Sequence, residues 1–302
     1  MNRHFFQRLI SQSFVRYVEH HALIDSTNNR ARRLALGEEA FWDYSASAPK
    51  ALQECLPGLI LADQQSAGRG RGSNRWWTGP GSLAMSLLLP PVHQWSRIFR
   101  SATANSPDVA QRAASEKNLA AFCFTNSADR EISTGLVGLA TALAVVRTVR
   151  PRLPGVEVGI HWPNDVFADG KKLAGILVEV LSTGLVIVGI GVNTNNTAHQ
   201  APEELRLRLT TLRDLTGQGH PHDRFLPELL NSLENVFSRL VSIPDRLAAE
   251  VHRWCLQRGR SLKVRTPGGD TEGICEGIGP QGELVLNTPT GVRRIFSGCI
   301  LG

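Results

Sequence analysis

Glycine and arginine alternate at residues 68–72, which read Gly-Arg-Gly-Arg-Gly and follow a short apolar run. Glycine allows a ligand to approach the backbone closely, and successive backbone N–H groups form a nest for an anion. The guanidinium groups of Arg69 and Arg71 add donors suited to phosphate or carboxylate oxygens. The pattern predicts an anion-binding loop, but a flexible RNA-binding segment or a solvated loop fits it equally well.

A second constellation joins residues 162–165, Trp-Pro-Asn-Asp, to residues 172–175, Lys-Leu-Ala-Gly. The Ala-Asp-Gly sequence between them is typical of a hairpin turn. We therefore expect the hairpin to bring Asp165 close to Lys172. From these residues alone, an ordinary hairpin with exposed lysines is favoured over a phosphate or carboxylate site.

Two shorter motifs complete the set of candidate residues. Ser26-Thr27-Asn28 precedes a helical stretch, and by itself it predicts a helix N-cap. The free N–H groups of a helix N-terminus also bind polar ligand groups. Residues 189–193 read Gly-Ile-Gly-Val-Asn, and two glycines within a strand usually mark close approach of another backbone or of a ligand.

The order and spacing of these four motifs resemble the biotin–protein ligase family, from about residue 24 to the C-terminus apart from residues 92–131. The resemblance implies that the chain activates biotin with ATP and Mg²⁺ to biotinyl-adenylate. It then transfers biotin to a lysine of a biotin carboxyl carrier domain. The implied fold is α/β (α+β): a mixed β-sheet with helices packed on it, as in class II aminoacyl-tRNA synthetases, plus a small C-terminal Src-homology-3-like β-barrel.

The resemblance also implies roles for individual residues. Lys172 corresponds to the main catalytic lysine, Arg69 and Arg71 to a loop that closes over the adenylate, and Asp165 is a candidate proton acceptor. The residues expected to bind biotin or the nucleotide are Ser26, Thr27, Asn28, Gln65, Gly68, Gly70, Trp76, Asn164, Gly175, Ile176, Gly189, Gly191 and Asn193. No metal ligand is assigned.

The expected elements divide the chain into two domains, residues 1–258 and 259–302. Residues 1–13 resemble a polar arm, and the Ala/Ser/Asn/Arg-rich residues 92–131 an insertion that is partly helical at best. Strands are predicted at residues 14–24, 58–62, 83–89, 156–162, 172–180 and 185–192. Helices are predicted at residues 132–149, 202–216, 223–242 and 245–258. Short strands at residues 261–265, 271–278, 283–286 and 292–296, separated by Gly/Pro turns, predict the small barrel.

Composition narrows the class of protein. The 302 residues suggest about two domains. The 33 Lys and Arg against 27 Asp and Glu give a formal net charge of +6, which favours anionic partners without naming one. No apolar run reaches the roughly 20 residues that a membrane span needs. The five widely spaced cysteines indicate reduced thiols and a cytoplasmic protein.

Other functions compete with the biotin ligase hypothesis. A lipoate- or octanoate-type cofactor ligase would share the fold but not the pairing of residues 162–165 with residues 172–175. A basic nucleic-acid-binding regulator would use Arg69, Arg71 and the net positive charge. About 24 residues precede Ser26-Thr27-Asn28, too few for a winged helix-turn-helix. We therefore expect a ligase without repressor function or DNA binding; a homodimer is left open.

Overall fold

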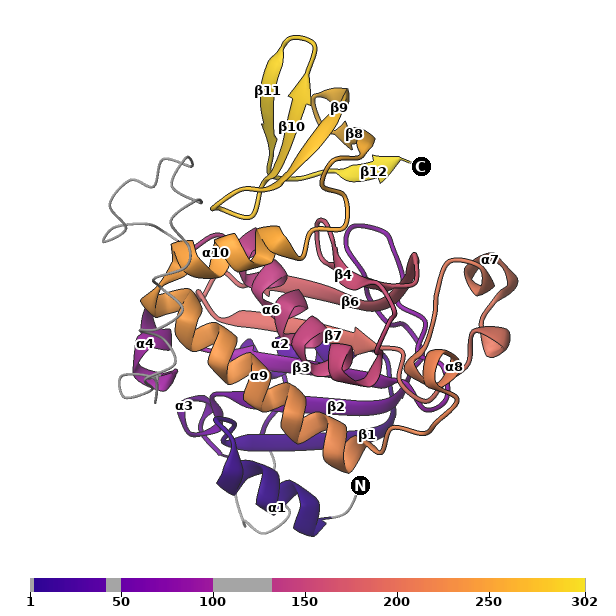
Figure 1. The fold of residues 1–302 in the computed structure, drawn as a ribbon. Coiled ribbons are helices and arrows are strands. Elements are labelled where there is room, and N and C mark those ends of the chain that lie inside the picture. Colours follow the sequence, from indigo (N-terminus) through magenta and orange to yellow (C-terminus); the bar gives the residue numbers. More distant parts are fainter. Residues whose placement is uncertain (1–2, 42–49, 100–131, 302) are drawn as a thin grey trace, which may run out of the picture.

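The computed structural model describes residues 3–41, 50–99 and 132–301, which form two β-sheets and the helices around them (Figure 1). A 7-stranded sheet has the strand order β1-β2-β3-β7-β6-β5-β4. Its strands are β1 (Tyr17–Ile24), β2 (Gly58–Gln65), β3 (Leu83–Leu89), β4 (Val158–His161), β5 (Asp165–Ala168), β6 (Lys171–Val180) and β7 (Val186–Val192). Strands β1 and β2 are parallel and all other neighbours are antiparallel, so the sheet is mixed.

Helices cover both faces of this sheet. Helices α6 (Thr134–Val149) and α9 (His222–Ser242) lie on the face seen in Figure 1, and α2 (Thr27–Ala35) lies behind the sheet. Two apolar cores result, because neighbouring residues of a strand point to opposite faces. Leu59 and Val188 belong to the α6 and α9 core, whereas Ile60 and Ile187 belong to the α2 core.

A 5-stranded antiparallel sheet follows helix α10 (Pro244–Arg253) and lies at the top of Figure 1. Its strands are β8 (Ser261–Thr266), β9 (Gly269–Ile278), β10 (Leu284–Thr288), β11 (Gly291–Ile295) and β12 (Cys299–Leu301), in the order β11-β10-β9-β8-β12. The turn before β10 contacts the larger part: Trp162 donates its indole N–H to the Gly282 carbonyl at 3.0 Å. Strand β12 was not predicted from the sequence.

The remaining α-helices of the described residues are short. They are α1 (Arg3–Gln12), α3 (Leu52–Cys55), α4 (Trp95–Ile98), α7 (Glu203–Arg206) and α8 (Leu212–Thr216). The expected fold class is confirmed, and so is the hairpin turn: Asp169 and Gly170, both at positive φ, connect β5 to β6. Within the described ranges, no helix has the length and apolar character needed to cross a membrane.

Three sequence expectations are wrong. The helix predicted at residues 202–216 is two short helices, α7 and α8, because the chain between them pairs with β6, where the Thr210 N–H donates to the Lys172 carbonyl. Residues 1–13 do not form a polar arm, because α1 buries Phe5 and Leu9, which lie one turn apart on one face. The proposed insertion does not begin at residue 92, since α4 places Trp95 and Phe99 in the core beside Phe237 of α9. The rest of that insertion, residues 100–131, lies outside the described residues.

Candidate active site

A cavity of about 600 Å³ opens on the α2 face of the large sheet and reaches the C-terminal sheet. Its volume is within the range of small-molecule sites. Its lining comes from the N-terminus of α2, residues 69–76, the β5–β6 hairpin, β7 and residues 297–300. Every motif that the sequence singled out therefore contributes to one cavity.

The start of α2 forms an ordered polar wall. Gln65 accepts hydrogen bonds at its Oε1 atom from the Thr27 backbone N–H at 2.8 Å and from the Thr27 hydroxyl at 3.2 Å. Ser86 donates to Asn28 Oδ1 at 2.6 Å. Ser26 occupies the N-cap position, but its side chain makes no capping hydrogen bond. The wall is thus held in place by hydrogen bonds within the protein before any ligand binds.

Small residues form a trough across three neighbouring strands. Ala84 of β3 pairs with Gly191 of β7, and Gly191 pairs with Gly175 of β6. The ring of Trp76 lies over the trough: a Cβ built on Gly191 would lie 2.3 Å from it, and one built on Gly175 would lie 3.1 Å from it. A side chain at Gly191 would therefore displace the ring, whereas one at Gly175 would make a tight contact with it. The Trp76 indole N–H is buried and has no hydrogen-bond partner among the described residues, so it remains an unused donor.

Lys172 and Asp165 form an ion pair at the floor of the cavity, with Lys172 Nζ 2.7 Å from Asp165 Oδ2. The second carboxylate oxygen of Asp165, Oδ1, is buried and has no hydrogen-bond partner within residues 3–41, 50–99 and 132–301. Residues outside the hairpin also hold the backbone of Lys172 in place. Its N–H donates to the Arg208 carbonyl, and its carbonyl accepts from the Thr210 N–H. The predicted proximity of Asp165 and Lys172 is confirmed.

Asn164 and His161 shape the same end of the cavity. The side-chain amide of Asn164 donates to the Ile176 carbonyl, which ties β6 to the segment before β5. His161 stacks on Phe167 with ring centroids 4.2 Å apart. Burial lowers the pKa of His161 and outweighs the opposing effect of Asp165, so the imidazole is neutral at pH 7.

Residues 68–76 fold back on themselves as a narrow loop. The Trp76 N–H donates to the Gly68 carbonyl and the Gly70 N–H to the Asn74 carbonyl. A side chain at Gly68 would collide with the Trp76 carbonyl, only 2.4 Å from the Cβ position, which explains this glycine. The Arg71 guanidinium reaches Ser297 Oγ of the C-terminal sheet region at 3.5 Å.

All the residues proposed from the sequence line the cavity except Gly68 and Asn193. Asn193 is buried beside it, and its side-chain oxygen accepts a hydrogen bond from Asn196 at 3.0 Å. The sequence reasoning missed Ser86, Glu179 and residues 297–300. Ser86 and Glu179 each interrupt an apolar strand, which is the signal that could have revealed them. Nothing in the sequence pattern pointed to residues 297–300.

Comparisons with known proteins agree with this fold and site. Residues 114–195 match the model of the biotin/lipoate A/B protein ligase family, and residues 259–299 match the biotin protein ligase C-terminal domain. A biotin protein ligase from Aquifex aeolicus, solved in complex with biotin and ATP, has the same fold. It superposes with a TM-score of 0.66 at 23% identity, over 94% of this chain and 97% of that one. The fold and the site thus define a cofactor–protein ligase.

Two curated relatives narrow the class. The biotin–[acetyl-CoA-carboxylase] ligase of Mycobacterium tuberculosis is 39% identical over 237 residues, covering 76% of this chain and 73% of that protein. The protein of the same name from Paracoccus denitrificans is 30% identical over 284 residues, covering 91% and 95%. The chain belongs to the biotin protein ligase family.

Proposed function

We propose that this enzyme activates biotin with ATP to biotinyl-5′-AMP and transfers the biotinyl group to a lysine of a biotin carboxyl carrier domain. The single observation that carries the proposal is the Lys172–Asp165 pair facing the ordered polar wall of Thr27, Asn28 and Gln65 across one cavity. The names of the two relatives support an acceptor in acetyl-CoA carboxylase. The Aquifex aeolicus complex supports biotin and ATP as the substrates.

In the first step the biotin carboxylate attacks the α-phosphate of ATP and pyrophosphate leaves. A carboxylate is ionised at pH 7, so no general base is needed. Negative charge grows on the phosphate oxygens, and a positioned cation lowers that barrier. Lys172 supplies one such cation, and Arg71, which forms no ion pair with another described residue, supplies the second. The apolar surface that Trp76 forms with Gly175 and Gly191 would exclude water from the reactive anhydride.

In the second step the acceptor lysine attacks the carbonyl of biotinyl-5′-AMP, an amide C–N bond forms and AMP leaves. The lysine ammonium, with a reference pKa of about 10.4, must first lose a proton. Asp165 can accept that proton at its Oδ1 atom, which has no partner among the residues that the structure describes, while Oδ2 stays with Lys172. Asp165 would therefore hold Lys172 in position in the first step and accept a proton in the second.

The fold family implies Mg²⁺ on the ATP phosphates. Among the described residues, no group of three or more His, Cys, Asp or Glu side chains could hold a metal ion. Asp165, which lines the cavity, nonetheless fits a magnesium ion bound mainly by phosphate oxygens in the first step, before its Oδ1 atom accepts the lysine proton in the second. Such an ion would neutralise phosphate charge when bound. A cytoplasmic location and the lack of DNA binding stay predictions, and a homodimer stays open.

Biotin-dependent exchange of labelled pyrophosphate into ATP tests the proposal. We expect exchange with biotin and none with octanoate or lipoate. Exchange with octanoate or lipoate alone would instead assign the site to a different cofactor ligase. A salt-dependent shift of DNA or RNA, without any exchange, would favour the nucleic-acid-binding regulator.

A further inference from the structure

Glu179 does not line the cavity, but it holds together residues from two separate walls of it. It belongs to β6, and its side chain is only 12% exposed. Asn28 donates from Nδ2 to Glu179 Oε2 at 2.9 Å. Arg69 donates from Nη1 to the same oxygen at 3.1 Å, and Arg32 donates from Nη2 to Oε1 at 2.6 Å.

The contact with Asn28 decides which way its amide faces. A carboxylate only accepts hydrogen bonds, so Asn28 must direct its NH₂ group toward Glu179. The Ser86 hydroxyl meets the opposite end, Oδ1, and Gly189 leaves the space for this side chain, since a Cβ there would lie 2.2 Å from Oδ1. Glu179 and Ser86 together leave one NH₂ hydrogen and one Oδ1 lone pair of Asn28 for a ligand.

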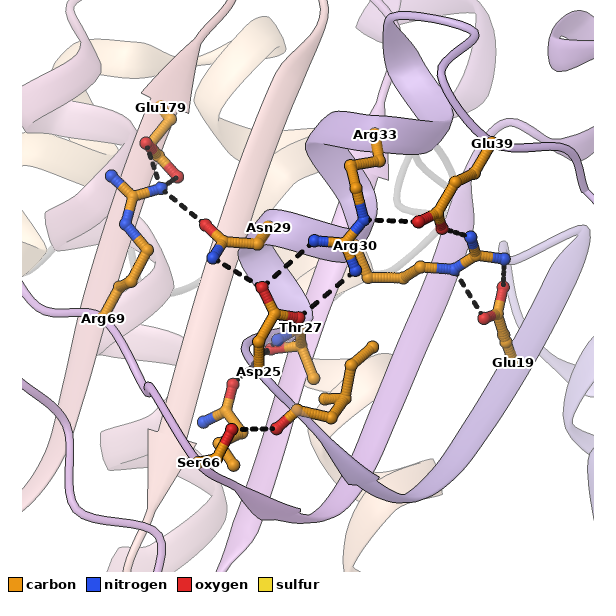
Figure 2. A network of polar contacts seen from close by, with 12 residues as sticks. Glu19, Asp25, Thr27, Asn29, Arg30, Arg33, Glu39, Ser66, Arg69 and Glu179 are labelled. Carbon is orange, nitrogen blue, oxygen red and sulfur yellow. Dashed lines mark hydrogen bonds and ion pairs between the residues drawn. The ribbon is translucent and has the colours of Figure 1, made fainter.

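The contact with Arg69 fixes the beginning of the loop of residues 68–76. Arg69 also reaches Asn29 Oδ1 at 3.3 Å, so the loop is joined to α2 as well as to β6. Figure 2 shows Arg69 between Glu179 and Asn29, with Asn29 continuing to Asp25 and Arg33 along the helix. The carboxylate that orients Asn28 therefore also anchors the loop.

We propose that Glu179 is a positioning residue that couples the biotin-binding wall at Asn28 to the adenylate loop at Arg69. This inference rests on the proposed function, because it assigns biotin to the Asn28 side of the cavity. Loss of the carboxylate would free the Asn28 amide to rotate and would release the loop at Arg69. Biotin affinity and the order of the adenylate loop would then both change, although Glu179 itself contacts neither biotin nor the nucleotide.

Glu250 provides a matched control. Its side chain is 14% exposed, and two arginines, Arg147 and Arg239, bond to it as two arginines bond to Glu179. It lies in α10 and does not line the cavity. If both ion pairs were purely structural, loss of either carboxylate would affect biotin affinity alike. If Glu179 is a positioning residue, only its loss weakens biotin binding.

Glu179→Gln and Glu250→Gln are compared with the wild-type enzyme by calorimetric titration with biotin and by pyrophosphate exchange. Removing a hydrogen bond to a charged group changes affinity about 10- to 100-fold. We expect a rise of that size in the biotin Kd and KM of Glu179→Gln, with a smaller change in kcat. Trypsin should also cleave its loop faster after Arg69 and Arg71. Glu250→Gln should lower the melting temperature and leave biotin affinity and loop cleavage unchanged.

Equal biotin affinity and equal loop cleavage in Glu179→Gln and the wild type would overturn the inference. If Glu179→Gln does not fold, Arg32→Gln tests the same link, because Arg32 bonds Glu179, is partly exposed and does not line the cavity. It should raise the biotin KM a few-fold, and an unchanged KM would overturn the inference. A wild-type enzyme that binds no biotin would instead defeat the proposed function itself.

Discussion

Lys172 Nζ lies 2.7 Å from Asp165 Oδ2, across two neighbouring antiparallel strands of one hairpin. The pairing register and the turn at Asp169 and Gly170 set this distance locally. The cation is therefore in position before ATP binds, so little reorganisation is needed during the reaction. Asp165 bonds Lys172 through Oδ2 alone, and its Oδ1 atom is buried with no hydrogen-bond partner in the described parts of the chain.

Lys172→Ala should nearly abolish the formation of biotinyl-5′-AMP while the protein stays folded. A single positioned donor at a reacting centre contributes about 10²–10³ in rate. Pyrophosphate exchange measures the loss and circular dichroism checks the fold. Lys171→Ala is the control, because this neighbouring lysine is exposed and lies outside the cavity lining. A Lys172→Ala enzyme with a near wild-type rate would contradict the assigned role.

Gly189→Ala should weaken biotin binding. The added methyl group would lie 2.2 Å from Asn28 Oδ1, so the Asn28 side chain must move away from Ser86. We expect a higher biotin KM and an almost unchanged ATP KM, measured by varying each substrate in the exchange assay. Gly135→Ala in α6 is the control, since the nearest atom to its added methyl would be 3.8 Å away. Equal effects of both variants on biotin KM would refute the role of Gly189.

The loop of residues 68–76 should become protected from trypsin when biotin and ATP are present. Arg69 is already held by Glu179, whereas Arg71 reaches only Ser297 among the described residues. We therefore expect cleavage after Arg71 and Arg75 to fall more than cleavage after Arg69. Peptide mass analysis over a time course gives each rate. Identical rates with and without substrates would show that the loop does not close over the adenylate.

Local patterns predicted the parts of the site that depend on neighbouring residues. The β5–β6 hairpin followed from the turn at Ala168-Asp169-Gly170, and the apolar runs located β3 and β7. Contacts between distant residues could not be predicted in this way. The role of Glu179 depends on its contacts with Asn28, 151 positions earlier, and with Arg69, 110 positions earlier. Residues 297–300 reach the cavity only because the two sheets meet.

Asp25→Asn should lower stability at neutral pH and change how stability depends on acid. Burial raises the Asp25 pKa, but hydrogen bonds from Arg33 and Asn29 outweigh it and lower the pKa from 3.8 to about 2. A carboxyl with a lowered folded-state pKa stabilises the protein above its unfolded-state pKa. That stabilisation decreases from about pH 4 and is lost as the pH falls through about 2.

Urea unfolding of wild type and Asp25→Asn at several pH values measures this effect. The difference in unfolding free energy between the two proteins should be constant from pH 7 to about pH 5 and should shrink below about pH 4. The other carboxylates titrate in both proteins and cancel in the difference. A difference that stays constant down to pH 2 would show that the Asp25 charge does not stabilise the fold.

Trp95 should be indispensable for stability, which limits where the chain can be shortened. Its side chain is fully buried, its ring centroid lies 4.9 Å from that of Phe237, and its indole N–H donates to the Pro90 carbonyl at 2.8 Å. Trp95→Ala should cost about 3–5 kcal/mol of unfolding free energy. Trp95→Phe keeps most of the apolar contact and should cost less, as urea unfolding of both variants would show.

The insertion predicted at residues 92–131 is a candidate for deletion, but a deletion that begins at residue 95 would remove Trp95 and Phe99 from the core. Replacing only residues 101–128 with a Gly/Ser linker keeps both aromatic rings. Because loop-closure entropy changes slowly with length, we expect this shorter deletion to fold and to form biotinyl-5′-AMP within a few-fold of the wild-type rate. A folded deletion variant without adenylation activity would place the removed segment in the active site. For the Trp95 variants, a loss of unfolding free energy in Trp95→Phe as large as that in Trp95→Ala would contradict the expectation. It would show that the hydrogen bond to Pro90, more than the packing against Phe237, holds α4 in place.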